Sequence, residues 1–320
     1  MGFNIVSPVF IVLLLGYFAK QKGYIDNNFV DKGTWIVFYM ALPFKLFYDI
    51  KNARIESLHP KYVAYILLGV IFVIFISLII GKSMSIRDRR KLSAFVHCAY
   101  RSNFVYVGFP ILDIIYNGAP SMEHMIVIIA FGLTLYNISA IVLLTYYSES
   151  EDKSISISNI LIKIIKNPMI AGVVFGAIFN FLNLPVYRGV DKAIEMVAKI
   201  STPMSLILIG ASLNFESSRS DFKIMFTSAF IKTVLAPLIL IPVGVKLGFT
   251  NMELGIAYVF WATPCAANCF IFTKQMKSDH EFASKVITLS FIMSIITYPV
   301  GISLMNYFCL LYTSDAADDL

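Results

Sequence analysis

The chain has 320 residues, of which 58% are hydrophobic and 14% are charged, whereas a soluble globular domain has about 45–50% apolar and about 25% charged residues. The apolar excess runs along the whole chain, so the composition excludes a sizeable soluble domain and predicts a polytopic membrane protein. The formal net charge of +6 does not predict a nucleic-acid partner, because the lysines and arginines cluster in short loops.

Ten apolar segments follow one another along the chain, separated by charged or turn-rich loops. A helix needs about 20 residues to cross a lipid bilayer, and no runs of about ten residues alternate as a membrane barrel requires. The first segment lacks a preceding basic region, which predicts a retained helix rather than a cleaved signal. The segments lie at about 3–19, 30–50, 61–82, 92–116, 122–147, 159–182, 192–213, 222–246, 252–275 and 282–310.

The distribution of basic residues predicts the orientation of these segments in the cytoplasmic membrane. Loops after odd-numbered segments carry 16 lysines and arginines, and loops after even-numbered segments carry 6. The positive-inside rule therefore places the odd loops in the cytoplasm and both termini outside. The polar, acidic stretch 311–320 is interpreted as a disordered tail or a cloning scar.

Ten segments divide into two sets of five, residues 1–147 and 159–310, joined by a short cytoplasmic linker at 148–158. Because five is odd, the second set is expected to be inverted in the membrane relative to the first. The predicted fold class is therefore an all-α polytopic membrane protein made of two inverted five-helix repeats.

Helix-breaking residues occur at matching places in the two sets. Segment 4 contains Arg101-Ser102-Asn103 and Gly108-Phe109-Pro110, and segment 9 contains Thr263-Pro264 followed by Asn268. Proline removes a backbone donor, and the carbonyl groups freed in lipid must find partners in protein or in a water-filled cavity. A single proline, such as Pro43 or Pro203, is more often a simple kink. The matched pair in segments 4 and 9 instead predicts broken helices at a transporter's central site.

Two basic residues within the segments need a reason, because a charge at the bilayer centre costs about 2.5–3.5 kcal/mol on insertion scales. Arg101 abuts the break in segment 4 and is expected either to anchor that helix or to act at the site. Lys232 lies well inside segment 8, where a role near a cavity is favoured. Among the acidic residues only Asp113 is a plausible intramembrane group, so the balance favours an anionic ligand over a cation. Lys45 has no assigned role.

Three asparagines complete the candidate site. Asn103, Asn137 and Asn268 lie within apolar segments, where an unpaired amide is costly. Their amide groups are able to donate to a carboxylate, and the N-termini of half-helices add a partial positive charge. The alternative is that they join neighbouring helices by hydrogen bonds, a frequent use of asparagine in membranes.

Enzyme functions find no support in the sequence. The histidines are scattered, no nucleophile motif is present, and no glycine loop would bind a phosphate. Cys265 and Cys269 are one helical turn apart, which is interpreted as small apolar packing rather than a metal or redox pair. No cofactor and no metal are therefore expected.

Several motifs resemble the auxin efflux carrier family, which includes bacterial malate-permease-like members. The resemblance extends from about residue 3 to 308, and the order and spacing of the motifs carry it. They are Leu14-Leu15-Gly16-Tyr17-Phe18-Ala19-Lys20, Ala41-Leu42-Pro43, Arg101-Ser102-Asn103, Gly108-Phe109-Pro110, Tyr136-Asn137, Lys166-Asn167-Pro168, Thr202-Pro203-Met204-Ser205-Leu206, Gly210-Ala211-Ser212-Leu213, Lys232 with Pro237, and Pro264 with Asn268.

The resemblance implies two inverted repeats, crossing broken helices 4 and 9, and a transport domain that moves against a scaffold domain. It maps the family's crossover site onto five residues, with Asn137 close by: Asn103, Gly108, Pro110, Pro264 and Asn268. Family members carry organic anions such as dicarboxylates or indole acids. The linker at 148–158 is much shorter than the central loop of the plant carriers, which favours a microbial member.

The sequence therefore predicts a secondary transporter of small carboxylates that works by alternating access. Expected partners are the organic anion, the lipid bilayer, and a proton or sodium ion as coupling ion, whereas a homodimer stays an open alternative. A cation exchanger that depends on Asp113 and a membrane sensor without transport are the competing hypotheses.

Overall fold

A computed structural model describes residues 2–52, 60–116, 125, 128–147, 168–213 and 221–311. Within these ranges all regular secondary structure is helical, which confirms the all-α class. Four helical stretches are long and apolar enough to cross a membrane: Pro60–Ser83, Arg188–Ser212, Phe222–Lys246 and His280–Tyr307. The expected linker at 148–158 and residues 312–320 of the expected tail lie outside the described ranges.

The first part of the chain forms helices at the positions of the first five apolar segments. Asp26 begins one of them by accepting a hydrogen bond from the amide of Phe29 at 2.7 Å, and Asp88 begins another by accepting from Arg90 at 2.8 Å; both contacts satisfy N-terminal donors. The helices are α1 (Gly2–Gln21), α2 (Asn27–Ile36), η1 (Val37–Ala41), α3 (Leu42–Lys51), α4 (Pro60–Ser83), α5 (Arg89–Tyr100), η2 (Phe104–Gly108), α6 (Phe109–Ile115), η3 (Ile128–Leu133) and α8 (Thr134–Tyr147), where η denotes a π-helical turn.

The described residues of the second part of the chain are also helical. Thr250 and Glu253 form a capping box at the start of one helix, in which each side chain satisfies a backbone donor of the other residue. Asp279 begins the last helix by accepting from the amide of Phe282 at 2.9 Å. The helices are α10 (Pro168–Phe181), α11 (Arg188–Ser212), α12 (Phe222–Phe230), η5 (Ile231–Leu235), α13 (Ala236–Lys246), α14 (Asn251–Ala262), α15 (Asn268–Gln275) and α16 (His280–Tyr307).

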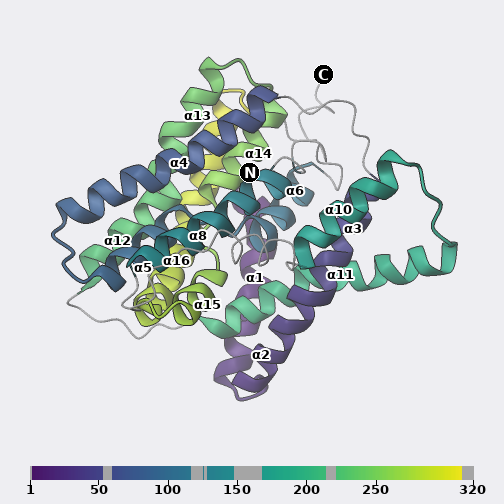
Figure 1. Ribbon diagram of the computed structural model, residues 1–320, viewed down its shortest axis with the longest axis horizontal. Helices are drawn as coiled ribbons and strands as arrows, with labels where there is room; N and C mark the ends of the chain where they lie inside the picture. The colour runs from purple at the N-terminus through teal and green to yellow at the C-terminus, as the bar shows by residue number, and fades with distance from the viewer. Residues whose placement is uncertain are drawn as a thin grey trace.

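The helices pack into two groups, which are joined by a contact between α1 and α16. The first helix group comprises α1, α2, α3, α10 and α11, in which α10 and α11 lie against α3 and α11 also lies against α1. The second helix group comprises α4, α5, α8 and α12 to α16, in which α5 contacts α4, α8, α12 and α16. Figure 1 shows α3, α10 and α11 on one side of the molecule, apart from α4, α12 and α13.

Glycines allow α1 and α11 to approach each other at the level of the backbone. A Cβ atom on Gly210 would lie 1.8 Å from the carbonyl oxygen of Leu13, and one on Gly16 would lie 2.1 Å from that of Ile207. Small residues at helix interfaces permit this close packing in membranes, where the hydrophobic effect does not drive helices together. The contact joins a helix from each half of the sequence.

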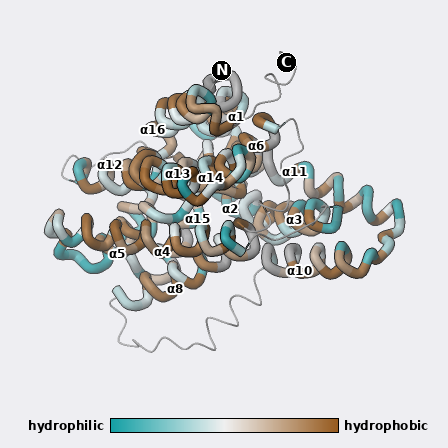
Figure 2. Tube along the Cα trace, turned by 90° about the horizontal axis from the view of Figure 1, so that it is seen from above, coloured by the Kyte–Doolittle hydropathy of each residue, from teal (hydrophilic) through white to brown (hydrophobic). Residues whose placement is uncertain are grey.

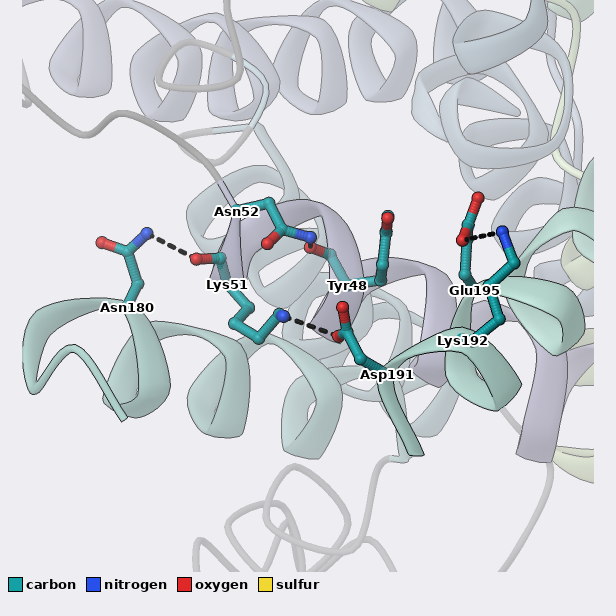
Figure 3. A network of polar contacts seen from close by, with 7 residues as sticks. All are labelled: Tyr48, Lys51, Asn52, Asn180, Asp191, Lys192 and Glu195. Carbon is teal, nitrogen blue, oxygen red and sulfur yellow. Dashed lines mark hydrogen bonds and ion pairs between the residues drawn. The ribbon is translucent and has the colours of Figure 1, made fainter. Parts of the chain in front are cut away.

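Polar contacts join α3, α10 and α11 at one end of the first helix group (Figure 3). The Nζ of Lys51 lies 2.6 Å from the Oδ1 of Asp191, and the side chain of Asn180 donates to the carbonyl of Lys51 at 2.9 Å. Further along α11, Lys192 pairs with Glu195 at 2.9 Å. The contacts of Lys51 fix the end of α3 to the consecutive helices α10 and α11, which come from a distant part of the sequence.

The outer surface of the helices is apolar, as a lipid-facing surface requires. On α4, Leu68 and Phe75 are 64% and 62% exposed, whereas Ile66 and Val70 are fully buried. Hydrophobic stretches also run along α8, α10 and α13 (Figure 2). The buried side of α4 packs on the protein and its exposed side fits a hydrocarbon environment.

Candidate functional site

The two predicted helix breaks in segments 4 and 9 lie against each other. The helix α5 ends at Tyr100, and α14 ends at Ala262. Beyond these ends the backbone is extended, and Ser102 and Cys265 form an isolated antiparallel bridge. The amide of Asn103 donates to the carbonyl of Pro264 at 3.0 Å, and the amide of Ala266 donates to the carbonyl of Arg101 at 3.1 Å. We call residues 101–103 and 263–267 the crossover.

Each break therefore satisfies backbone groups of the other. The hydroxyl groups of Ser102 and Thr263 are also hydrogen-bonded to each other, and the amide of Cys265 donates to the Oγ of Ser290 at 3.0 Å. Because lipid offers no partner to a free peptide group, these contacts explain how two helices are interrupted inside an apolar environment.

In segment 4 the break lies at a different place from its proline. Pro110 is in the first turn of α6, and the helix is continuous from Phe104 onward through the π-helical turn η2. The amide of Phe109 donates to the carbonyl of Phe104, five residues earlier. This wider π-helical turn lets the helix continue although Pro110 has no amide hydrogen to donate. The expected interruption at Gly108-Phe109-Pro110 is thus wrong, whereas the one at Arg101-Ser102-Asn103 is present.

Pro43 and Pro203 interrupt no helix. Pro43 lies in the first turn of α3, directly after the π-helical turn η1, and Pro203 lies inside the continuous α11. Both prolines are therefore accommodated as local distortions, and only segments 4 and 9 contain extended breaks within the described ranges.

Lys232 supports the end of the broken helix α14. Its side chain is 1% exposed, and its Nζ donates to the carbonyl oxygens of Trp261 at 2.5 Å and Phe260 at 3.5 Å. The last carbonyl groups of a helix have no partner within the helix and carry a partial negative charge. The buried amino group of Lys232 donates to these carbonyl groups and balances their partial negative charge. Lys232 lies in the π-helical turn η5.

Arg101 is held by groups on two other helices. Its Nη2 donates to the Oδ1 of Asn137 at 2.8 Å, and its Nη1 donates to the carbonyl of Tyr136 at 3.3 Å. The guanidinium carbon lies 4.5 Å from the ring centroid of Phe272, a distance typical of a cation–π contact. Arg101 and Asn137 thus form one unit at the crossover, and Arg101 is both an anchor and a local positive charge.

Asn103 is 1% exposed, and neither its Oδ1 nor its Nδ2 has a hydrogen-bond partner among the described residues. It directly precedes the turn η2, at the start of the second half of segment 4. Buried amide groups normally have partners, so the unpaired side chain of Asn103, which lies within the crossover, departs from this rule.

A cavity of about 940 Å³ lies between the two helix groups. Its first wall consists of α2, η1 and α11, and contributes aromatic side chains such as Trp35 and Tyr39 together with Ser205 and Ser212. Its second wall includes Asn137 on α8, Asn268 on α15 and Ser284 on α16. A mostly apolar cavity with a few polar groups is typical of a small-molecule site.

Two of the predicted site residues line the cavity, and the others whose side chains the structure describes do not. Asn137 and Asn268 line the cavity, but Asn103, Gly108, Pro264, Arg101 and Lys232 are not among its lining residues. The side chain of Pro110 lies outside what the structure describes. The crossover and the cavity meet at Ala267 and Asn268, where α15 begins.

The first wall of the cavity contains polar residues that the sequence did not predict. Thr34 and Ser205 are polar groups on that wall, and they come from α2 and α11, which carry no break within the described ranges. The small polar residues of Ser201–Ser212 on an otherwise apolar segment were the available signal, since small residues leave room beside a helix.

Comparison with known proteins agrees with this architecture. A family model described as membrane transport protein matches residues 2–302. The uncharacterized transporter YfdV of Escherichia coli strain K12 is 22% identical over 298 residues, which cover 92% of this chain and 95% of that protein. An uncharacterized transporter of Methanothermobacter thermautotrophicus is 22% identical over 304 residues, with the same two coverages. The chain therefore belongs to the membrane transport protein family, the family of the auxin efflux carriers that its motifs resemble.

Proposed function

We propose that this protein is a secondary transporter that moves small carboxylates across the cytoplasmic membrane by alternating access. The observation that best supports this proposal is the cavity between the two helix groups, whose second wall presents Asn137 and Asn268. A cavity between two packed bodies is able to open to either side of a membrane when one body moves against the other.

The chemistry of the second wall favours an anion. The amide groups of Asn137 and Asn268 are able to donate to a carboxylate, and the first turn of α15 adds the partial positive charge of a helix N-terminus. The Nη2 of Arg101 donates to the Oδ1 of Asn137 at 2.8 Å, which places a positive charge next to this asparagine. Among the described residues that line the cavity, only Asp31 carries a carboxylate, and it lies at an exposed position on α2.

In this proposal the chain forms ten spans as two inverted five-helix repeats, with both termini outside. The first helix group serves as the scaffold, and the second helix group carries the substrate together with the crossover. The unpaired amide of Asn103 gains a partner when this group moves or when the anion enters deeper than the present cavity.

The decisive experiment is uptake of labelled dicarboxylates, monocarboxylates and indole acids into liposomes that contain Asn268→Ala. Loss of a hydrogen bond to a charged group costs about 1.5–3 kcal/mol, so at least about a tenfold lower initial rate is expected. Asn251→Ala is the matched control, because Asn251 is a half-buried residue at the start of α14 that does not line the cavity and donates to the carbonyl of Cys309 at 2.8 Å. Normal uptake by a correctly inserted Asn268→Ala protein contradicts the site.

The same liposomes test the coupling ion, which we propose to be a proton or sodium. Imposing either gradient shows which ion accelerates uptake of the anion. The competing cation exchanger is tested with Asp113→Asn, whose cation flux should be lost if that hypothesis holds. Saturable binding of a carboxylate without any flux would instead support a sensor.

A further inference from the structure

Three cysteines from separate parts of the fold converge beside the crossover. Cys98 lies in the last turn of α5, Cys265 lies in the break of segment 9, and Cys269 lies in the first turn of α15. Their Sγ atoms all lie within 4.8 Å of one another, and all three residues are buried. Proximity in sequence explains at most one of these contacts, because Cys98 is far along the chain from the other two.

Besides one another, the thiols have weak backbone partners, and Cys269 also interacts with the side chain of His97. The Sγ of Cys265 lies 3.8 Å from the carbonyl of Ala266, and the Sγ of Cys269 lies 3.8 Å from the carbonyl of His97. The Nε2 of His97 itself is buried with no partner in the described part of the chain. Sulfur is a poor donor and acceptor, so the cluster leaves its three strongest metal-ligand atoms available.

Burial disfavours thiolates at this site, and nearby positive charge offsets part of that cost. Lys232 is close enough to Cys265 and Cys269 to interact with both electrostatically. The first turn of α15, which contains Cys269, adds the partial positive charge of a helix N-terminus. A set of thiolates is therefore less costly here than in the apolar environment alone.

We propose that Cys98, Cys265 and Cys269 form a binding site for a soft monovalent metal ion, Cu(I), held by three sulfur ligands. With metal–sulfur bonds of about 2.3 Å, a trigonal arrangement places its sulfur atoms about 4.0 Å apart, a spacing that the cluster reaches with small rotations of the side chains. Soft thiolate ligands select Cu(I) among the common metal ions. Zn(II) is less suitable, because it requires four ligands and three are grouped here.

Coordination releases the three thiol protons, so Cu(I) with three thiolates carries two net negative charges, which the ammonium of Lys232 partly offsets. The bound ion would join α5, the break of segment 9 and α15 at one point. Its expected effect is to stabilise the crossover, independently of which substrate occupies the cavity.

The test is metal binding by the purified full chain in detergent, without oxygen and with ascorbate present. Cu(I) is added alone, a competing Cu(I) chelator is then applied, and the metal retained after desalting is measured. We expect retention of a single copper ion per chain and a higher melting temperature. Cys98→Ser, Cys265→Ser and Cys269→Ser should each lose both effects. Cys309→Ser is the matched control and should keep them, because Cys309 is exposed and outside the cluster.

X-ray absorption of the copper-loaded wild-type protein provides a readout that does not depend on the folding of any variant. Three sulfur neighbours at about 2.3 Å support the site. Retention of copper in the variant that lacks all three cysteines overturns the proposal, and so do nitrogen or oxygen neighbours in place of sulfur. Absence of any retained metal shows that the three thiols only fill space.

Discussion

Lys232 and Arg101 are buried cations near the same crossover, yet they stabilise different groups. Lys232 donates to backbone carbonyls at the end of α14, whereas Arg101 donates to the side chain of Asn137. Both positions follow from the sequence, because a charge within an apolar segment is conspicuous. The partners do not follow, because Arg101 is separated from Asn137 by 36 residues and Lys232 from Trp261 by 29.

Replacing Lys232 with methionine should destabilise the protein without weakening substrate binding directly. The change leaves the carbonyls of Trp261 and Phe260 buried without their donor, which costs about 1–3 kcal/mol. The measurement is the melting temperature in detergent, combined with the dissociation constant of a transported carboxylate at a temperature where both proteins are folded. Lys223→Met, at an exposed position on α12, is the control. A selective loss of affinity with unchanged stability would assign Lys232 to the substrate instead.

Asn137→Asp separates the two roles of the Arg101–Asn137 unit. The new carboxylate still accepts the hydrogen bond from Arg101, so the melting temperature should not fall. Asn137 also lines the cavity, and two like charges about 4 Å apart repel by about 4 kcal/mol at an effective dielectric constant of 20. Affinity for a carboxylate, measured by calorimetry, should therefore drop at least about tenfold. Equal affinity in the two proteins would place the anion elsewhere.

The individual residues of the candidate site are only partly predictable from the sequence. Asn137 and Asn268 are predicted as site residues because they are polar groups in apolar segments; both line the cavity, and their role in binding stays a prediction. Asn103 was singled out for the same reason but lies buried away from it. Residue type and position along one segment do not specify which side of a helix faces a cavity that two groups of helices enclose.

The helices show why a proline alone is a weak signal of a break. Thr263, the residue before Pro264, is extended, with φ and ψ of −56° and 148°, as the ring of the following proline favours. Leu42 precedes Pro43 with helical angles of −68° and −47°, because the adjacent π-helical turn relieves the clash. The break at Arg101–Asn103 contains no proline. It exists because the extended strand of segment 9 supplies its partners, a long-range cause that one segment does not reveal.

The close contact of α1 with α11 gives a prediction for one element pair. Gly210→Ala would place a methyl group against the backbone of α1, and overpacking of this kind costs about 1–3 kcal/mol. The melting temperature should fall, and the first helix group should become more accessible to protease. On the same helix, Gly189→Ala should have little effect, since its Cβ would meet only the ring of Tyr187 at 3.0 Å. Equal melting temperatures for the two variants would show that α1 and α11 are able to move apart freely.

For the whole molecule, the alternation of charged loops and apolar segments was enough to predict an all-helical membrane protein, and the described helices confirm that class. The number of spans and their inverted repeat stay predictions. The division into two helix groups was implied only by family resemblance, because the packing of α3 against α10 joins segments 2 and 6, which no local pattern connects.

The predicted orientation is testable with the native Cys309, since the other three cysteines are buried. A membrane-impermeant maleimide applied to intact cells should label Cys309, which follows α16, and should not label Cys309→Ser. Arg87→Cys, introduced into Cys309→Ser, lies at an exposed position in a predicted cytoplasmic loop and should react only after the cells are opened. Labelling of Arg87→Cys in intact cells, and of Cys309 only after the cells are opened, would show that the orientation is opposite to the predicted one.

The pairing of the two breaks has a consequence for biosynthesis. The hydroxyls of Ser102 and Thr263 are separated by 161 residues, a length that a ribosome synthesises in roughly ten to thirty seconds. During that interval the nascent segment 4 has no partner for its extended peptide groups. Until segment 9 is inserted, segment 4 must therefore be an unbroken helix, be shielded by other protein, or stay near the membrane surface. The first five segments reach their final structure only after segment 9 is in place.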